Sequence, residues 1–168
     1  MDYFAEPVRS TLRARFGYGA RHRTAEPMCG EVEQDEPGTA QGIWFVAGTT
    51  ETYPEDPHLA LVHDNIDPTQ PAFSVGQSLS RAGLPAESRL NPGVYIFAPE
   101  AAGRRNREFR DLAVDGLVYC HDTLRYHPGG VVLMQLTSAT TLRVERQAAA
   151  GCGAGPWAFT SAYTDFER

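Results

Sequence analysis

The chain has 168 residues and a mass of 18.4 kDa, which is the size of a single domain. Its 42% hydrophobic and 10% aromatic residues and its mean hydropathy of -0.36 predict a soluble protein with a real core, neither a membrane protein nor a disordered chain. All 15 basic residues are arginine, and 21 acidic residues bring the net charge to -6 and the pI to about 5.3, so neither a nucleic acid nor a membrane is expected as a partner. Arginine without any lysine is typical of a GC-rich bacterial coding bias.

The beginning of the chain carries no apolar stretch of the kind found in secretory signals, because Glu6, Pro7 and Arg9 follow the first residues closely. A cytoplasmic location is the default expectation. A secreted or periplasmic location is the alternative if the chain has been cut from a longer precursor.

One short amphipathic helix is expected near the start. Four apolar side chains recur there at four-residue spacing: Phe4, Val8, Leu12 and Phe16. Pro7 suits the first turn of such a helix, and Gly17 and Gly19 end it. We expect residues 1–28 to form this helix and a linker, and the helix to pack outside the main fold or across one end of it.

From residue 29 onward the helical period is lost, and short runs of strand-forming residues alternate with Gly, Pro, Asn and Asp. The predicted strands are 42–46, 59–64, 72–75, 93–98, 117–121, 131–137, 141–146 and 157–166, and 31–34 would add a ninth. Turn sequences such as Asn91-Pro92-Gly93 and Asp115-Gly116 favour antiparallel neighbours. A parallel sheet would need helices of about ten residues or more between its strands, and only the weak stretch 75–86, interrupted by Gly83 and Pro85, could supply one.

A closed antiparallel barrel and a two-sheet sandwich both fit this strand count. The strands carry many small residues, which leave room inside a barrel: Gly42, Ala60, Ala72, Ser74, Ala98, Ala158 and Ala162. The sequence therefore predicts a mainly β fold, a single antiparallel barrel of eight to nine strands over residues 29–168, with one N-terminal helix.

The triplet Gly42-Ile43-Trp44 on the first predicted strand resembles the Gly-x-Trp signature of lipocalins. The resemblance implies that Trp44 closes one end of the barrel beneath an arginine from late in the chain, which would be Arg143, Arg146 or Arg168. The chain departs from lipocalins because it ends on a predicted strand, where that family usually has a helix near its end. It is therefore similar to the wider group of calycin-like barrels.

Aromatic residues spread over the predicted strands suggest a lined cavity. We predict that a small, mainly apolar ligand contacts the walls through Trp44, Tyr95, Tyr119 and Tyr163, with His63 and His121 as polar contacts. The alternative is an ordinary core, which is built from the same residue types.

An enzyme using the same barrel is the second hypothesis. In this case His63 or His121 would transfer a proton, with Asp64 beside it, and Tyr119 or an arginine would stabilise negative charge. Isomerase, cyclase or hydratase chemistry suits such a site. A third class, an interaction module that pairs through an edge strand or through its helix, also remains open, and the sequence does not predict an oligomeric state.

No cofactor and no metal site are predicted. His63 and His121, joined by His127, lack the spacing of a metal motif. Acidic residues gather at 31–36 and at Glu51, Glu55, Asp56, Asp64 and Asp67, but they contain no calcium-binding loop and fit solvated loops.

Three cysteines leave two alternatives open. Cys29 and Cys152 lie beside glycines in predicted loops and would form one disulfide, which leaves Cys120 as a buried thiol. The other alternative is three reduced thiols in a cytosolic protein.

Overall fold

The structure is a computed structural model that describes residues 3–31, 33–50, 58–122, 125 and 129–168. Several sequence predictions fall outside these residues: Val32 of the possible ninth strand, His127 of the histidine group, and Glu51, Glu55 and Asp56 of the acidic group.

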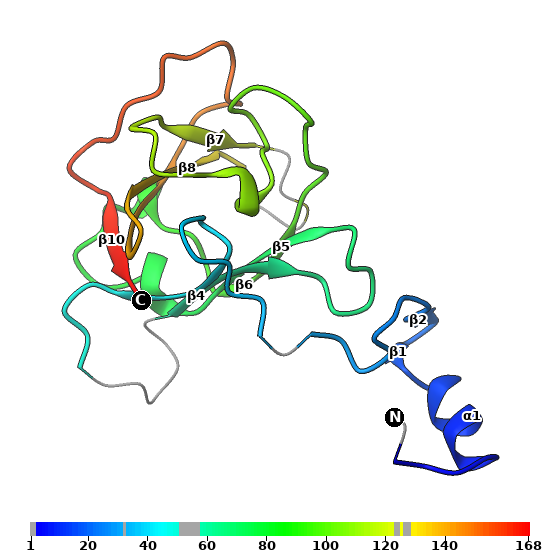
Figure 1. Cartoon of the computed structure of the whole chain (residues 1–168). Helices are drawn as coiled ribbons and strands as arrows, with labels where there is room; N and C mark the ends of the chain where they lie inside the picture. Colours follow the sequence, from blue (N-terminus) through cyan, green and yellow to red (C-terminus); the bar gives the residue numbers. More distant parts are fainter. Residues whose placement is uncertain (1–2, 32, 51–57, 123–124, 126–128) are drawn as a thin grey trace.

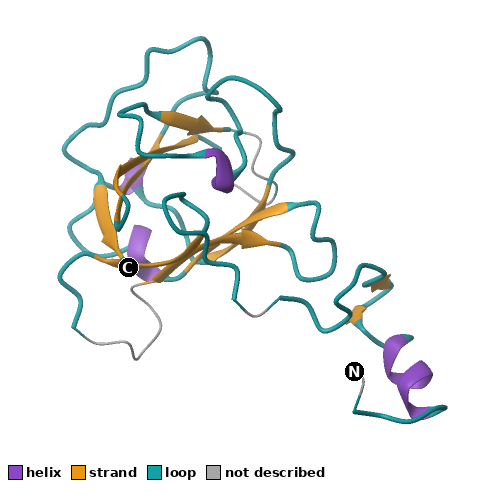
Figure 2. Ribbon diagram, viewed as in Figure 1, coloured by secondary structure: helices purple, strands orange, loops and turns teal. Residues whose placement is uncertain are grey.

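The body of the molecule is one antiparallel sheet of eight strands (Figures 1 and 2). Its strands are β3 (Gly42–Val46), β4 (His58–His63), β5 (Pro71–Val75), β6 (Gly93–Ile96), β7 (Tyr119–His121), β8 (Val131–Ser138), β9 (Thr141–Gln147) and β10 (Thr164–Glu167). Each of the eight main predicted runs therefore overlaps an observed strand. The last run was predicted too long, because residues 157–163 form a loop. The carboxylate of Glu145, on β9, holds this loop by accepting the backbone N–H of Thr160 at 2.8 Å.

The strands follow one another around a strongly curled sheet. Their spatial order is β6-β5-β4-β3-β10-β9-β8-β7. The last strand, β10, pairs with β3, and β6 and β7 form the two edges of the sheet, which share no ladder. Among the described residues, one isolated bridge reaches β6 from the chain beyond β7, where the Arg125 N–H donates to the Ile96 carbonyl at 2.8 Å. The sheet is therefore a half-barrel with one open seam, and a closed barrel is not confirmed.

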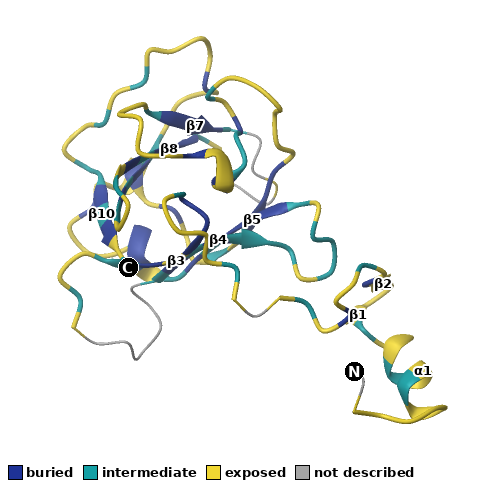
Figure 3. Ribbon diagram, viewed as in Figure 1, coloured by how far each residue is buried: buried dark blue, intermediate teal, exposed yellow. Residues whose placement is uncertain are grey.

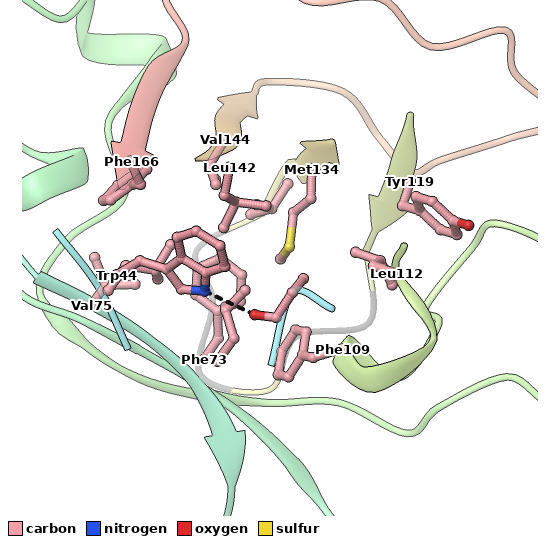
Figure 4. Close-up of a cluster of buried hydrophobic side chains, with 14 of the residues drawn as sticks. Trp44, Phe73, Val75, Phe109, Leu112, Tyr119, Met134, Leu142, Val144 and Phe166 are labelled. Carbon is pink, nitrogen blue, oxygen red and sulfur yellow. Dashed lines mark hydrogen bonds between the residues drawn. The ribbon is translucent and has the colours of Figure 1, made fainter. Parts of the chain in front are cut away.

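Side-chain alternation on these strands fills the concave side with a single hydrophobic cluster (Figure 4). On β3, for example, Trp44 is fully buried while the preceding Ile43 is exposed. The connection between β6 and β7 adds two large side chains to this cluster. Phe109 begins the 3₁₀ turn η3 (Phe109–Asp111), and Leu112 follows it directly. Two further 3₁₀ turns, η1 (Gln77–Leu79) and η2 (Ala86–Ser88), follow β5.

The N-terminal segment extends away from the sheet (Figures 1 and 3). It contains α1 (Val8–Arg13), the single α-helix of the described chain, and a small hairpin of β1 (Gly17–Tyr18) and β2 (Arg21–His22). The expectation that this helix packs against the main fold is wrong, because none of its residues is buried. A helix of six residues offers too small an apolar face to hold itself on a sheet.

A disulfide joins β7 to the loop that precedes β10, with Cys120 and Cys152 at a Cα–Cα distance of 5.9 Å. The predicted pairing of Cys29 with Cys152 is therefore wrong, and so is the alternative of three thiols. Cys120 points to the convex side of β7, opposite to His121, where Val131 and Leu133 bury it together with Cys152. Cys29 is exposed and lies outside this bond.

Candidate functional site

Trp44 is held by the end of the chain. Of the three arginines considered above, Arg168 is the one that stacks on it, with the guanidinium carbon 4.3 Å from the ring centroid. The same guanidinium donates to the carbonyls of Gln41 at 2.9 Å and Thr39 at 3.0 Å, and the Trp44 indole N–H donates to the Ala40 carbonyl at 2.9 Å (Figure 4). These contacts give Trp44 a structural role in the hydrophobic cluster.

The glycine of the Gly-x-Trp triplet has a physical reason in this arrangement. Gly42 has a φ of +134°, and a Cβ at this position would run into the Asp35 carboxylate and come within 2.9 Å of Arg168 Nη1. Position 42 therefore requires glycine, because Asp35 and Arg168 approach the start of β3 closely.

Tyr95 and Tyr119 lie on the two strands that border the open seam, and both are buried in the hydrophobic cluster. The Tyr95 hydroxyl donates to the Asn91 carbonyl at 2.6 Å, and that of Tyr119 donates to the Asp115 carboxylate at 2.7 Å. Burial and this hydrogen bond raise the pKa of Tyr119 to about 12, so its phenol stays protonated at neutral pH.

Tyr163, the fourth predicted wall residue, lies apart from the other three. Its ring stacks on Arg143, whose guanidinium carbon is 3.7 Å from the ring centroid, and it meets Phe159 edge-on. Arg143 is fixed from the other direction by two hydrogen bonds to the Asp165 carboxylate. Tyr163 thus belongs to a group built on the loop before β10.

His121 is fully buried in the aromatic part of the core. Its ring centroid is 4.9 Å from that of Phe97 and 5.9 Å from that of Phe109, and its Nε2 lies 3.0 Å from the Arg107 carbonyl. Burial lowers its pKa to about 4, so the ring is neutral at physiological pH.

His63, at the end of β4, has a different environment. Its side chain is 9% exposed, and its Nε2 lies 3.2 Å from Glu108 Oε2 and 3.4 Å from Arg110 Nη2. Its backbone N–H donates to Gln34 Oε1 at 2.7 Å. The histidine is thereby anchored through its backbone and its ring, while its partners come from two distant segments of the chain.

Asp64 follows His63 directly and shapes the next turn. Its Oδ1 accepts the backbone N–H groups of Ile66 at 2.9 Å and Asp67 at 2.7 Å. This carboxylate therefore caps the loop, as Asp side chains commonly do in turns.

His63 and Asp64 both line a pocket of about 170 Å³ between the end of β4 and the segment that links the N-terminal hairpin to the body. Its charged and polar lining includes Arg23, Glu31, Gln34 and Arg110. Arg23 is buried, and its guanidinium donates to the carbonyls of Pro27 at 2.9 Å and Asn65 at 2.6 Å. Both signs of charge thus meet in one small concave site.

The structure brings together only part of the site expected from the sequence. His63 and Asp64 share the pocket, whereas Trp44, Tyr95, Tyr119 and His121 lie in the core, and no described contact joins His63 to His121. Arg23 and Arg110, which line the pocket, and Glu108, which contacts His63, were not predicted as site residues. For Glu108 and Arg110 the one signal in the sequence is the charged run 104–111, inside a connection with no periodicity, and such a run also fits a solvated loop.

Among the described residues, no group of three or more His, Cys, Asp or Glu side chains could hold a metal ion, and no helix is long and apolar enough to cross a membrane. No protein-family model, no curated protein and no solved structure matches the chain. The function is therefore argued from the geometry of the pocket.

Proposed function

We propose that this protein binds a small polar molecule in the pocket beside His63, and that the ligand carries a carboxylate. The observation that carries the proposal is the placement of His63, Arg110 and Arg23 around one concave space of about 170 Å³. A cavity of about 150 Å³ can hold benzene, so a space of this volume suits a ligand with the size of a small amino acid.

The basic lining suits a carboxylate because a guanidinium offers several N–H donors in one plane. Arg110 is exposed at the pocket and already lies within 3.4 Å of the His63 ring. Arg23 is fixed by its two backbone acceptors, so little side-chain entropy is lost when it binds.

The acidic lining adds a second requirement. Glu31 and Asp64 face the same space, and a purely anionic ligand would be repelled by them. A ligand with an ammonium group as well as a carboxylate satisfies both signs, so we propose a free amino acid or a similar zwitterion.

Binding of an apolar molecule inside the curled sheet stays a prediction with weaker support. Its predicted walls, Trp44, Tyr95 and Tyr119, pack within the hydrophobic cluster, and Phe109 occupies the same interior. The open seam between β6 and β7 would be the entrance for such a ligand.

The test is isothermal titration calorimetry of the full chain with small amino acids, with the corresponding amines and with the corresponding simple carboxylates. We expect only the zwitterions to bind, and we expect Arg110→Gln to weaken binding at least about tenfold, the usual loss for a charge-assisted hydrogen bond. Arg81→Gln, at an exposed position outside the pocket, is the matched control. Equal affinity of Arg110→Gln and wild type, or no binding of any probe, would contradict the proposal.

A second candidate function is acid–base catalysis at the same pocket, favoured by the 3.2 Å contact between His63 Nε2 and Glu108 Oε2. A carboxylate that orients an imidazole is the arrangement used to position a general base. The check is to incubate the zwitterion that binds best with the protein and to follow its mass and stereochemistry. Conversion by wild type that is lost in His63→Gln supports catalysis, and an unchanged ligand counts against it.

A further inference from the structure

The N-terminal arm, defined as residues 3–22, presents a large apolar surface to solvent. No residue of α1 is buried (Figure 3). Four of the eight exposed large hydrophobic side chains among the described residues lie here, and two of them are the most exposed of the eight: Tyr3 at 98% and Tyr18 at 83%, with Val8 at 51% and Phe4 at 46%. Such a concentration of exposed apolar groups in one short segment is unusual for a monomer in water.

The charge of the arm is opposite to that of the rest of the chain. Residues 3–22 hold four arginines and one glutamate, a net charge of +3, whereas residues 23–168 hold 11 arginines and 19 acidic residues, a net charge of -8. Arg13 is paired with Glu26 at 3.0 Å, and Arg9 donates through Nε to the Phe4 carbonyl at 2.9 Å. The arm is thus both apolar and cationic, and it projects from an acidic body (Figure 1).

We propose that the arm docks on the surface of an anionic lipid bilayer. A segment with arginines beside aromatic and aliphatic side chains can bury its rings at the headgroup level while its guanidinium groups meet the lipid phosphates. Tyrosine favours this boundary because its ring is apolar and its hydroxyl is polar. The expectation of no membrane partner came from the average composition of the chain, which hides this asymmetry.

A second copy of the chain fits the arm less well. The acidic body would attract the arginines, but its exposed large apolar residues are scattered: Ile43 on β3, Val94 on β6, and Val114 and Leu117 in the turn before β7. An anionic bilayer offers charge and apolar depth over the whole length of the arm, so the observations favour lipid.

The test is co-sedimentation of the full chain with vesicles of phosphatidylcholine alone and of phosphatidylcholine with phosphatidylglycerol, at low and high salt. We expect binding only to the vesicles with phosphatidylglycerol, and weaker binding as salt increases. Arg9→Gln with Arg15→Gln should lower the partition coefficient about 30-fold, since each arginine near such a surface contributes about fivefold. Phe4→Ser with Val8→Ser should lower it by at least about tenfold.

The matched controls change the same residue types on the body. Arg81→Gln and Val94→Ser alter exposed positions far along the chain from the arm, so both should bind vesicles like wild type. Two results would overturn the proposal. One is no binding of wild type to the anionic vesicles at low salt. The other is a dimer in light scattering that the arm substitutions convert to a monomer while vesicle binding stays unchanged, which would assign the arm to a second copy.

Discussion

His121 shows how surroundings remove the usual chemistry of a histidine. The ring is buried against Phe97 and Phe109, and its pKa falls to about 4, so it stays neutral where an exposed histidine would begin to protonate. His63 differs because a carboxylate and a guanidinium reach it at the border of a pocket. The position of each ring, rather than its residue type, separates a core residue from a candidate ligand contact.

The burial of His121 makes stability depend on pH. Between the unfolded pKa of about 6.5 and the folded pKa of about 4, the unfolded chain binds a proton that the folded chain does not, so stability falls as the pH is lowered through this range. The loss at this site approaches about 3 kcal/mol near pH 4. Urea unfolding at pH 7 and pH 4.5 should show a smaller loss for His121→Phe than for wild type, and His22→Gln, at an exposed histidine, should behave like wild type. An equal loss in all three proteins would contradict the buried neutral ring.

Arg168 fixes the end of the chain through its shape as well as its charge. Its planar guanidinium covers the Trp44 ring and donates to the Gln41 and Thr39 carbonyls at once. We expect Arg168→Ala to lower the free energy of unfolding by about 2–4 kcal/mol, because the contact with the Trp44 ring and the two hydrogen bonds are lost. We expect Arg168→Lys to recover less than half of this loss. Denaturant unfolding followed by circular dichroism checks both variants. Full recovery by lysine would show that charge alone matters.

At the scale of elements, the connection between β6 and β7 fills part of the interior of the curled sheet with its own side chains. Phe109 of η3 contacts Phe73 and Phe97, with ring centroids 6.1 and 5.3 Å apart, and the Ala40 N–H donates to the Phe109 carbonyl. We expect Phe109→Ala to cost about 3–5 kcal/mol of stability and to create an apolar cavity. An apolar fluorescent probe should then bind the variant more tightly than wild type, whereas Phe4→Ala, at an exposed ring, should change neither quantity. Strong probe binding by wild type alone would instead support an apolar ligand inside the sheet.

The disulfide ties the long loop before β10 to β7. Cys120 and Cys152 are 32 residues apart, and a cross-link of that span stabilises a fold by about 3–4 kcal/mol in the chain-entropy account. We therefore expect Cys120→Ser with Cys152→Ser to lower the free energy of unfolding by that amount, and to lower it more than Cys29→Ser, which leaves the bond intact. In denatured wild type, two cysteines should resist a thiol reagent until reductant is added. Reaction of all three before reduction would contradict the bond.

At the scale of the whole molecule, the sequence predicted the strands far better than the site. Local alternation and turn residues act within a few positions, so runs such as 42–46 and 141–146 nearly coincide with β3 and β9. Closure of a barrel depends on the pairing of β6 with β7, which no local signal encodes.

The pocket was hard to predict because its parts are far apart in the chain. The folding of the curled sheet is what brings together three residues of the pocket: Gln34, His63 and Arg110. The connection that carries Arg110 also has no periodic pattern. The prediction of the cysteine pairing was wrong for the same reason, since spacing along the chain says little about which cysteines approach one another. Trp44 was different, because the resemblance of its triplet to a known signature implied a stacked arginine from late in the chain, and Arg168 makes this contact.

We propose that the ligand binds beside His63 and not inside the curled sheet. The most direct test is to follow the backbone amide signals of ¹⁵N-labelled full chain by nuclear magnetic resonance while small zwitterions are added. We expect the shifted signals to cluster at residues 23–31, 33–34, 63–68 and 108–110, which line or support the pocket. Shifts concentrated at Trp44, Tyr95 and Tyr119, with the signals around His63 unchanged, would contradict it and would place the ligand in the hydrophobic interior.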